Sequence, residues 1–181
     1  SVLVPALLQR GRRVRVLDAK WFGDKLRPSP GLEVVEGDIR DPEVVRAALQ
    51  GVQSVVHLAV LSNDPSTKLD EALTVSLNRD AAIRLIEEVR SKGVRRFVNT
   101  STTTAYGVRE EPEVHEDVPH RLITLYGRAK PETPRLAASP ATADSAIVSL
   151  RPATVCGLTP HMRLALQANV LTCQAVLDGG M

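Results

Sequence analysis

Residues 32–60, LEVVEGDIRDPEVVRAALQGVQSVVHLAV, contain one complete strand–helix–strand pattern. The aliphatic runs at its two ends flank a segment that begins with Asp-Pro-Glu at 41–43 and ends before Gly51. Aspartate at the N-cap, proline at the first helical position and an acid in the first turn are typical of a helix start. We therefore expect a helix between two strands here.

The same alternation extends in both directions along the chain. We expect strands at 14–17, 96–99 and 146–150, and helices at the start of the chain and over 69–91, 126–138 and 163–177. Short aliphatic strands that alternate with helices predict an α/β fold, with a doubly wound parallel sheet covered on both faces. Ligands bind at the carboxyl ends of such strands, so polar residues at strand ends are the candidate functional residues.

The composition excludes several classes of protein. The chain has 181 residues, of which 43% are hydrophobic and 24% charged, as in a globular domain. Lys and Arg total 23 against 21 Asp and Glu, and only 3% of residues are aromatic, which argues against nucleic-acid binding. Membrane spans need about 20 consecutive apolar residues, and no run approaches that. With two cysteines and no metal-binding spacing, we expect a cytoplasmic protein without a metal.

The pair Tyr126 and Lys130 carries the sharpest chemical signal. Residues four apart share one face of a helix, and a nearby ammonium favours the phenolate form of tyrosine. Such a tyrosine can act as a general acid or base. Thr102 lies upstream in a Ser/Thr cluster at a strand end, where its hydroxyl can hydrogen-bond a reacting oxygen. The alternatives are an ordinary surface helix pair and an ordinary threonine-rich strand end.

Two acidic residues follow other predicted strands. Asp18 could accept hydrogen bonds from the ribose hydroxyls of an adenosine and repel a 2′-phosphate, which favours NAD over NADP. Asp38 could lie near an adenine amino group. A turn residue at Asp18 and a helix cap at Asp38 are the alternatives. His115 and His120 suggest a metal site only weakly, because Pro119 lies between them, and a solvated loop is the better interpretation.

The segments VRVLDA, VVEGDIRD, VVHLAV, RRFVNTSTTTAYG, LYGRAK and LRPATVCG occur in this order, with Asn78 on the long helix between the third and fourth. This set resembles the NAD-dependent epimerase/dehydratase family of extended short-chain dehydrogenases/reductases, over essentially the whole chain. The resemblance implies a Rossmann-like fold, NAD as cofactor and Thr102, Tyr126 and Lys130 as catalytic residues. It implies cofactor contacts at Asp18, Asp38, Ile39, Leu58, Ala59, Val60, Ser62, Asn78, Tyr126 and Lys130. It implies substrate contacts at Thr102, Asn169 and Val170.

The resemblance also implies an organisation and an activity. Residues 1–155 would form the NAD-binding domain and 156–181 the start of a substrate-binding region. The substrate would be a nucleotide sugar, with a UDP-sugar preferred, and the parent protein could be a homodimer. Dehydratases of the family commonly have an Asp-Glu pair directly after the catalytic hydroxyl. Thr103 and Thr104 stand there instead. This favours an epimerase, which is an isomerase, or a simple reductase, which is an oxidoreductase.

The chain also departs from the family pattern. Its 181 residues contain no glycine-rich first turn and no strand before the first helix, so we expect both ends to be cut and the chain itself to be inactive. Without that central strand, its two neighbours would either stay apart or pair anew. Pro131 and Pro134 interrupt the Tyr126 helix, and Pro131 should push Lys130 out of helical geometry. A catalytically dead relative that binds a nucleotide or a protein partner remains the alternative.

Overall fold

The computed structural model describes residues 2–62, 64–111, 113–130, 146–155, 157, 159 and 166–179. The chain divides into two compact units. Unit 1 contains Ser1–Val16, Phe22–Glu33 and Ala153–Met181, and unit 2 contains Leu17–Trp21 and Val34–Pro152.

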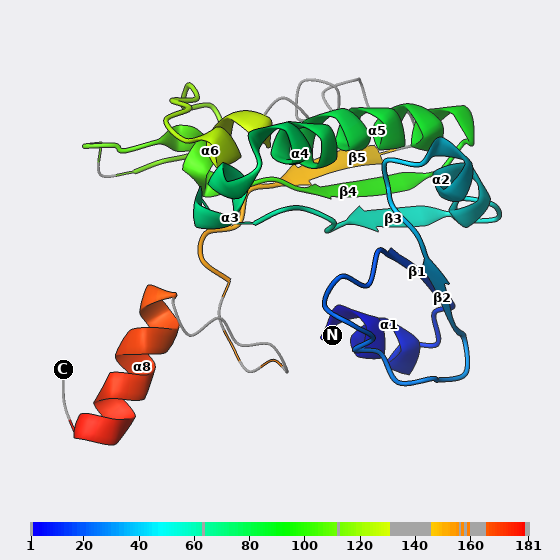
Figure 1. The fold of residues 1–181 in the computed structure, drawn as a ribbon, viewed down its shortest axis with the longest axis horizontal. Coiled ribbons are helices and arrows are strands. Elements are labelled where there is room, and N and C mark those ends of the chain that lie inside the picture. Colours follow the sequence, from blue (N-terminus) through cyan, green and yellow to red (C-terminus); the bar gives the residue numbers. More distant parts are fainter. Residues whose placement is uncertain are drawn as a thin grey trace. The chain divides into compact units, whose positions relative to one another are not determined.

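A parallel sheet forms the centre of unit 2 (Figure 1). Its strands are β3 (Ser54–His57), β4 (Arg96–Thr100) and β5 (Ala146–Leu150), in the order β3-β4-β5. The register aligns His57 with Asn99 and Asn99 with Ser149. The three carboxyl ends therefore lie at one edge of the sheet, as the alternating pattern predicts.

The helix expected within residues 32–60 is α2 (Pro42–Ala48). The Asp41 side chain caps it and accepts hydrogen bonds from the backbone N–H groups of Glu43 and Val44, at 2.9 and 3.4 Å. Proline occupies the first turn without loss, because an N–H there has no intrahelical partner. The sequence-based prediction of this helix is confirmed.

The single helix expected over 69–91 is wrong in detail. The structure has α3 (Asp64–Leu69), α4 (Glu71–Val75), a π-helical turn η1 (Ser76–Asp80) and α5 (Ala81–Ser91). A new helix begins because the Asp70 side chain accepts a hydrogen bond from Leu73 N–H at 2.8 Å, as an N-cap does. Single π-helical turns often occur at functional sites.

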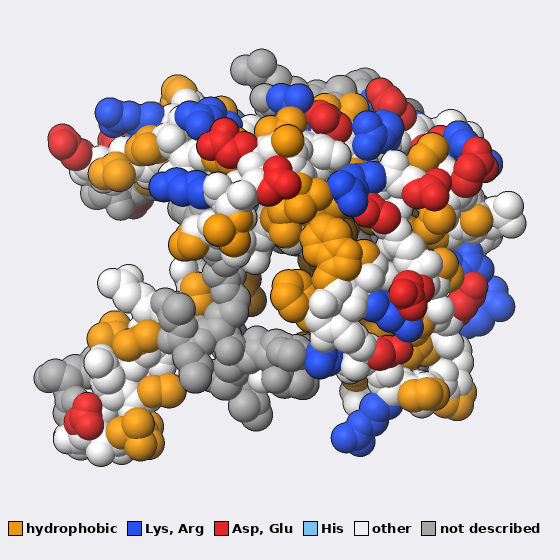
Figure 2. Space-filling view, viewed as in Figure 1, with side chains coloured by type: hydrophobic (Ala, Val, Ile, Leu, Met, Phe, Trp, Pro, Cys, Tyr) orange, Lys and Arg blue, Asp and Glu red, His pale blue; other side chains and the backbone are white. Residues whose placement is uncertain are grey.

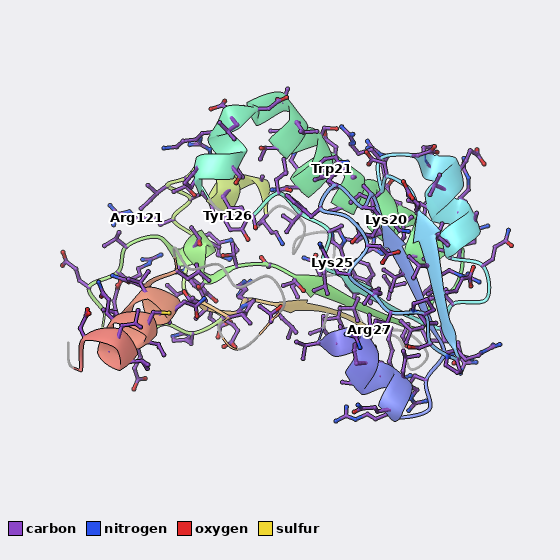
Figure 3. The ribbon with its side chains drawn as sticks, turned by 60° about the horizontal axis from the view of Figure 1, so that its bottom comes forward. Lys20, Trp21, Lys25, Arg27, Arg121 and Tyr126 are labelled. Carbon is purple, nitrogen blue, oxygen red and sulfur yellow. The ribbon has the colours of Figure 1, made fainter. Side chains whose placement is uncertain are left out.

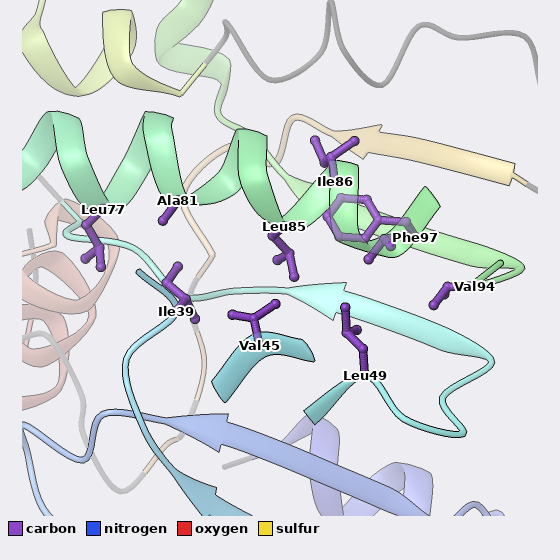
Figure 4. Packing of buried hydrophobic residues seen from close by; sticks show 10 residues of the cluster. Ile39, Val45, Leu49, Leu77, Ala81, Leu85, Ile86, Val94 and Phe97 are labelled. Atoms are coloured by element: carbon purple, nitrogen blue, oxygen red, sulfur yellow. The ribbon is translucent and has the colours of Figure 1, made fainter. Parts of the chain in front are cut away.

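The hydrophobic core of unit 2 lies between α2, α5 and one face of the sheet (Figure 4). Phe97, Ile86 and Val89 are among its fully buried side chains. On the opposite face, Val56 and Val148 are 44% and 47% exposed. Within the described part of unit 2, α2 and α5 cover the face of the sheet that carries the core (Figure 1).

Unit 1 contains α1 (Leu3–Gln9) and α8 (Gln167–Asp178), and α8 ends at Gly179, whose φ of 73° is left-handed. The strands β1 (Val14–Asp18) and β2 (Leu32–Glu36) pair in a two-stranded sheet. Among the described strands, β1 and β2 form one sheet and β3, β4 and β5 another. The strands β1 and β3 would flank the first strand of the family pattern, which this sequence does not contain. They are therefore not paired with each other.

The surface carries charges of both signs. Figure 2 shows cationic and anionic side chains interspersed along the side formed by α4 and α5. Within the described ranges, no helix has the length and apolarity that a membrane crossing needs.

Candidate active site

The carboxyl end of β4 continues directly into η2 (Thr103–Tyr106), a single 3-10 turn. Thr102 caps this turn, since its hydroxyl oxygen accepts a hydrogen bond from Thr104 N–H at 3.2 Å. The hydroxyl groups of Thr102 and Thr104 also lie 2.9 Å apart and share a hydrogen bond. Thr102 is buried, so this contact holds its hydroxyl in one place at the edge of the sheet.

The helix α6 (Leu125–Ala129) carries the Tyr126 side chain (Figure 3). Thr124 caps this helix and accepts a hydrogen bond from Gly127 N–H at 3.0 Å. A Cβ atom at Gly127 would lie 3.4 Å from the carbonyl oxygen of Thr104, so α6 packs directly against η2. This packing brings the helix with Tyr126 to the turn that follows Thr102.

Lys130 lies one turn beyond Tyr126 and reaches the same strand end. Its side chain is buried, and its Nζ donates a hydrogen bond to the carbonyl oxygen of Thr100, the last residue of β4. Lys130 and Thr102 are therefore brought to one strand end, and Tyr126 lies on the helix packed beside it. That the three residues act together in one active site stays a prediction.

The backbone of Lys130 is helical, with φ −82° and ψ −43°. The prediction that Pro131 displaces its predecessor from helical geometry is therefore wrong. The proline preference is weak enough to be overcome by local contacts, here the hydrogen bond from Lys130 N–H to Tyr126 O at 3.2 Å. Pro131 and Pro134 themselves lie outside the described residues.

Burial determines the ionisation of the lysine and of a neighbouring histidine. Burial lowers the pKa of Lys130 to about 8, so the ammonium form still predominates at neutral pH. Burial, and secondly the positive charge of Lys130, lower the pKa of His57 to about 4. His57 therefore stays neutral, with its ring stacked on Phe97 at 6.3 Å between centroids. This His–Lys proximity could not be predicted from the sequence, because it depends on the parallel pairing of β3 with β4.

The backbone after β3 carries the predicted cofactor positions Leu58, Ala59, Val60 and Ser62. Asn78, on the π-helical turn η1, holds this segment through two hydrogen bonds to Leu61. Leu61 N–H donates to Asn78 Oδ1 at 2.8 Å, and Asn78 Nδ2 donates to Leu61 O at 2.9 Å. The buried Asn78 amide thus makes the pair of hydrogen bonds that a neighbouring strand would otherwise make with Leu61. It therefore fixes the backbone of the segment that carries these predicted positions.

Asp18 ends β1 and is exposed. Its carboxylate accepts a hydrogen bond from Lys20 N–H at 2.7 Å, in a turn where Lys20 has a φ of 53°. The Lys20 ammonium lies 3.8 Å from the Glu36 carboxylate. The Asp18 carboxylate is therefore exposed to solvent, while the Lys20 ammonium is paired with Glu36.

Asp38 and Ile39 follow β2. The helix-cap interpretation of Asp38 is wrong, because Asp41 caps α2. The Asp38 carboxylate instead forms an ion pair with Arg40, and hydrogen bonds from the Arg40 side chain hold the Asp38 pKa below its usual value. Ile39 is 9% exposed and belongs to the hydrophobic core, so its backbone is what remains available to a ligand.

Of the three predicted substrate positions, Asn169 and Val170 lie on α8 in unit 1, whereas Thr102 lies in unit 2 with the other predicted site residues. His115 lies 3.9 Å from Asp117, and His120 lies edge-on to Tyr106. Among the described residues, no group of three or more His, Cys, Asp or Glu side chains could hold a metal ion.

Comparison with known proteins assigns the family. The model of the NAD dependent epimerase/dehydratase family matches residues 1–175, and the chain belongs to this family. Its Rossmann-like α/β fold, with parallel sheet pairing, is the fold expected from the sequence.

Individual relatives agree with the assignment. The chain is 31% identical over 133 residues to a UDP-glucose 4-epimerase of Streptomyces lividans, and the match covers 72% of this chain and 40% of that protein. It resembles WbmG of Bordetella bronchiseptica in complex with NAD and UDP, with a TM-score of 0.80, 28% identity and coverage of 98% of this chain and 56% of that one. A UDP-glucose 4-epimerase of Thermus thermophilus in complex with NAD gives the same TM-score and identity over 59% of its chain. The chain thus spans about two fifths of the length of the curated relative and somewhat over half of the solved chains.

Proposed function

We propose that the protein carrying this chain is an NAD-dependent epimerase of nucleotide sugars that transiently oxidises a sugar carbon. The observation that carries the proposal is the junction of β4 with α6, where Lys130 binds Thr100 O and α6 packs against the turn capped by Thr102. Membership of the NAD dependent epimerase/dehydratase family supports it. Relatives named as UDP-glucose 4-epimerases support a UDP-sugar as the substrate.

The described residues fit a dinucleotide. The exposed Asp18 carboxylate would hold the adenine ribose and repel a 2′-phosphate, so NAD is preferred to NADP. Asp38 and the Ile39 backbone would flank adenine. The segment held by Asn78 would line the cofactor with Leu58, Ala59, Val60 and Ser62, and Lys130 would hold the nicotinamide ribose. When bound, NAD supplies the hydride acceptor.

The chain's own residues supply the acid–base chemistry. Tyr126 accepts the proton of the sugar hydroxyl, and the neighbouring Lys130 ammonium favours the phenolate that can do so. The buried Thr102 hydroxyl would hydrogen-bond the same sugar oxygen and orient it. Because the Lys130 pKa is about 8, this ammonium is lost as the pH rises through 8, and Tyr126 then loses its electrostatic support.

Two features refine the reaction class and organisation. Thr103 and Thr104 follow Thr102 where dehydratases of the family carry Asp-Glu, which favours epimerisation over loss of water. Residues 1–155 would bind NAD, and the region that begins at 156, with Asn169 and Val170, would grip the nucleotide diphosphate. The 181 residues contain no glycine-rich turn for the pyrophosphate, so we propose that they do not turn over substrate when expressed alone.

The test combines binding with turnover. For the protein that carries this chain, calorimetry should show tighter binding of NAD than of NADP, and Asp18→Asn should reduce that preference. NMR should show conversion of UDP-glucose to its 4-epimer. Tyr126→Phe should reduce the conversion at least about a hundredfold, as loss of a general acid–base does. Arg128→Met, at an exposed position of the same helix, should leave the rate unchanged.

The outcomes separate the alternatives. NAD binding without conversion of any tested UDP-sugar would contradict the epimerase proposal and support a relative that binds nucleotide without turnover. Failure to bind either dinucleotide would contradict both.

A further inference from the structure

We propose that Arg151 is a positioning residue: it clamps Tyr106 and the loop of residues 107–121, and thereby fixes the Thr102 hydroxyl. Arg151 directly follows β5, whose carboxyl end lies beside that of β4. The expected effect of Arg151 on catalysis rests on the proposed function. The contacts of Arg151 with Tyr106 and the loop do not depend on it.

The backbone on both sides of Thr102 is tied to the residues around Arg151. Ser101 N–H donates to Leu150 O at 2.7 Å, and Thr103 N–H donates to Pro152 O at 3.4 Å. Thr102 therefore lies between two contacts with the end of β5. Arg151 stands between the two acceptors, so its position is rigidly related to Thr102.

The Arg151 side chain then binds the far end of η2. Its NH1 group donates to the Tyr106 hydroxyl at 2.8 Å, and the guanidinium lies 5.4 Å from the centroid of the Tyr106 ring. Tyr106 is 7% exposed, and the Arg151 Nε is buried without a hydrogen-bond partner among the described residues. A planar guanidinium both stacks and donates in this way, which a lysine ammonium does not reproduce. The turn that begins at Thr102 is thus fixed at both ends.

The same guanidinium reaches the loop. Arg151 NH1 donates to Glu116 O at 3.3 Å, and the His120 ring packs edge-on against Tyr106. Arg109 binds Tyr106 O at 2.9 Å, and Arg121 N–H donates to Ala105 O at 2.9 Å. Loss of Arg151 would therefore remove the side-chain contacts with Tyr106 and Glu116, while the ties made by Arg109, Arg121, Ser101 and Thr103 would remain.

The experiment compares Arg151→Met, Arg151→Lys and Tyr106→Phe in the protein that carries this chain. Arg95→Met, at an exposed position before β4, is the matched control for loss of an arginine. Hydrogen–deuterium exchange of residues 103–121 measures the clamp, and thermal unfolding shows that each variant folds. Steady-state kinetics with UDP-glucose, and NAD affinity by calorimetry, measure the consequence for the site.

We expect Arg151→Met to raise exchange in 103–121 about tenfold or more, because hydrogen bonds to charged groups are among the stronger ones. It should lower kcat by a similar factor at unchanged NAD affinity, since Thr102 contacts the sugar oxygen. Arg151→Lys should not restore kcat, and Tyr106→Phe, which keeps the ring, should have a smaller effect. Arg95→Met should change neither exchange nor kcat.

Unchanged exchange in folded Arg151→Met would overturn the clamp. Raised exchange with unchanged kcat would overturn the positioning role. If Arg151→Met does not fold, Tyr106→Phe and Arg151→Lys decide, and wild-type exchange and kcat in both would overturn the proposal. If the wild type binds NAD but converts no UDP-sugar, the proposed function fails, while raised exchange would still support the clamp.

Discussion

Two neighbouring strand ends of unit 2 are held in different ways. The segment after β3, residues 58–62, is held by a side chain, since both hydrogen bonds at Leu61 come from the Asn78 amide. The segment after β4, residues 101–106, is held largely by backbone contacts with the residues at the end of β5 and by the Arg151 clamp. One substitution can release the first segment, whereas the second keeps its backbone ties when a side chain is lost.

This difference predicts different effects of substitutions in the two segments. The predicted cofactor positions follow β3, and the predicted catalytic threonine follows β4. We therefore expect substitutions near β3 to affect NAD affinity together with stability. Substitutions near β4 should affect the chemical step, with a smaller effect on stability.

The largest effect on stability is expected for Asn78→Leu. Loss of the amide leaves Leu61 N–H and C=O without their hydrogen bonds. Each unsatisfied group costs about 1–3 kcal/mol, so the free energy of unfolding should fall by about 4 kcal/mol. NAD affinity should fall with it. Asn78→Asp keeps an acceptor for Leu61 N–H but sets a buried carboxylate oxygen against Leu61 O, so it should also lose stability. Urea unfolding measures the difference, and a loss below about 1 kcal/mol for Asn78→Leu would contradict the comparison.

A smaller effect is expected from His57 at acid pH. The folded pKa of about 4 lies below the ordinary 6.5, so the unfolded state binds a proton that the folded state does not. Stability is complete above pH 6.5 and is lost as the pH falls toward 4, by up to about 3 kcal/mol. His57→Phe should flatten this part of the stability–pH profile. An equally steep acid loss in the variant would show that other groups cause it.

The smallest of the three effects is expected at the end of η2. Gly107 has a φ of 68°, and a Cβ there would lie 2.5 Å from Arg121 O, so Gly107→Ala should destabilise by roughly 1–3 kcal/mol. Gly51→Ala is the matched control, because Gly51 has a φ of 70° but open space around its Cβ position. Chemical denaturation of both variants separates the clash from the backbone strain. Equal losses would mean that the loop yields at Arg121.

Local chemistry made much of the fold predictable. The Asp41-Pro42 start of α2 and the aliphatic runs of β3, β4 and β5 each depend on residues adjacent in the chain. The proximity of His57 to Lys130 was not predictable, because it depends on which strands are neighbours. The clamp of Arg151 on Tyr106 was missed for the same reason, although an arginine directly after a strand end was visible in LRPATVCG.

The helix boundaries were also only partly predictable from the sequence. Hydrophobic periodicity over 69–91 continues through the Asp70 cap and the π-helical turn, so it could not separate α3, α4 and α5. Lys130 was expected to leave helical geometry before Pro131, and its contacts with Tyr126 and Thr100 kept it helical. Local contacts at Asp70 and Tyr126, and the tertiary contact of Lys130 with Thr100, therefore decided these details.

The central claim is that Tyr126 is the acid–base residue of a site shared with Thr102 and Lys130. The most direct measurement is the rate of a single turnover, followed by the absorbance of reduced nicotinamide after the protein that carries this chain is mixed with NAD and UDP-glucose. The account predicts a signal in the wild type that forms at least about a hundredfold more slowly in Tyr126→Phe, at similar NAD affinity. Equal rates in the two proteins would contradict it.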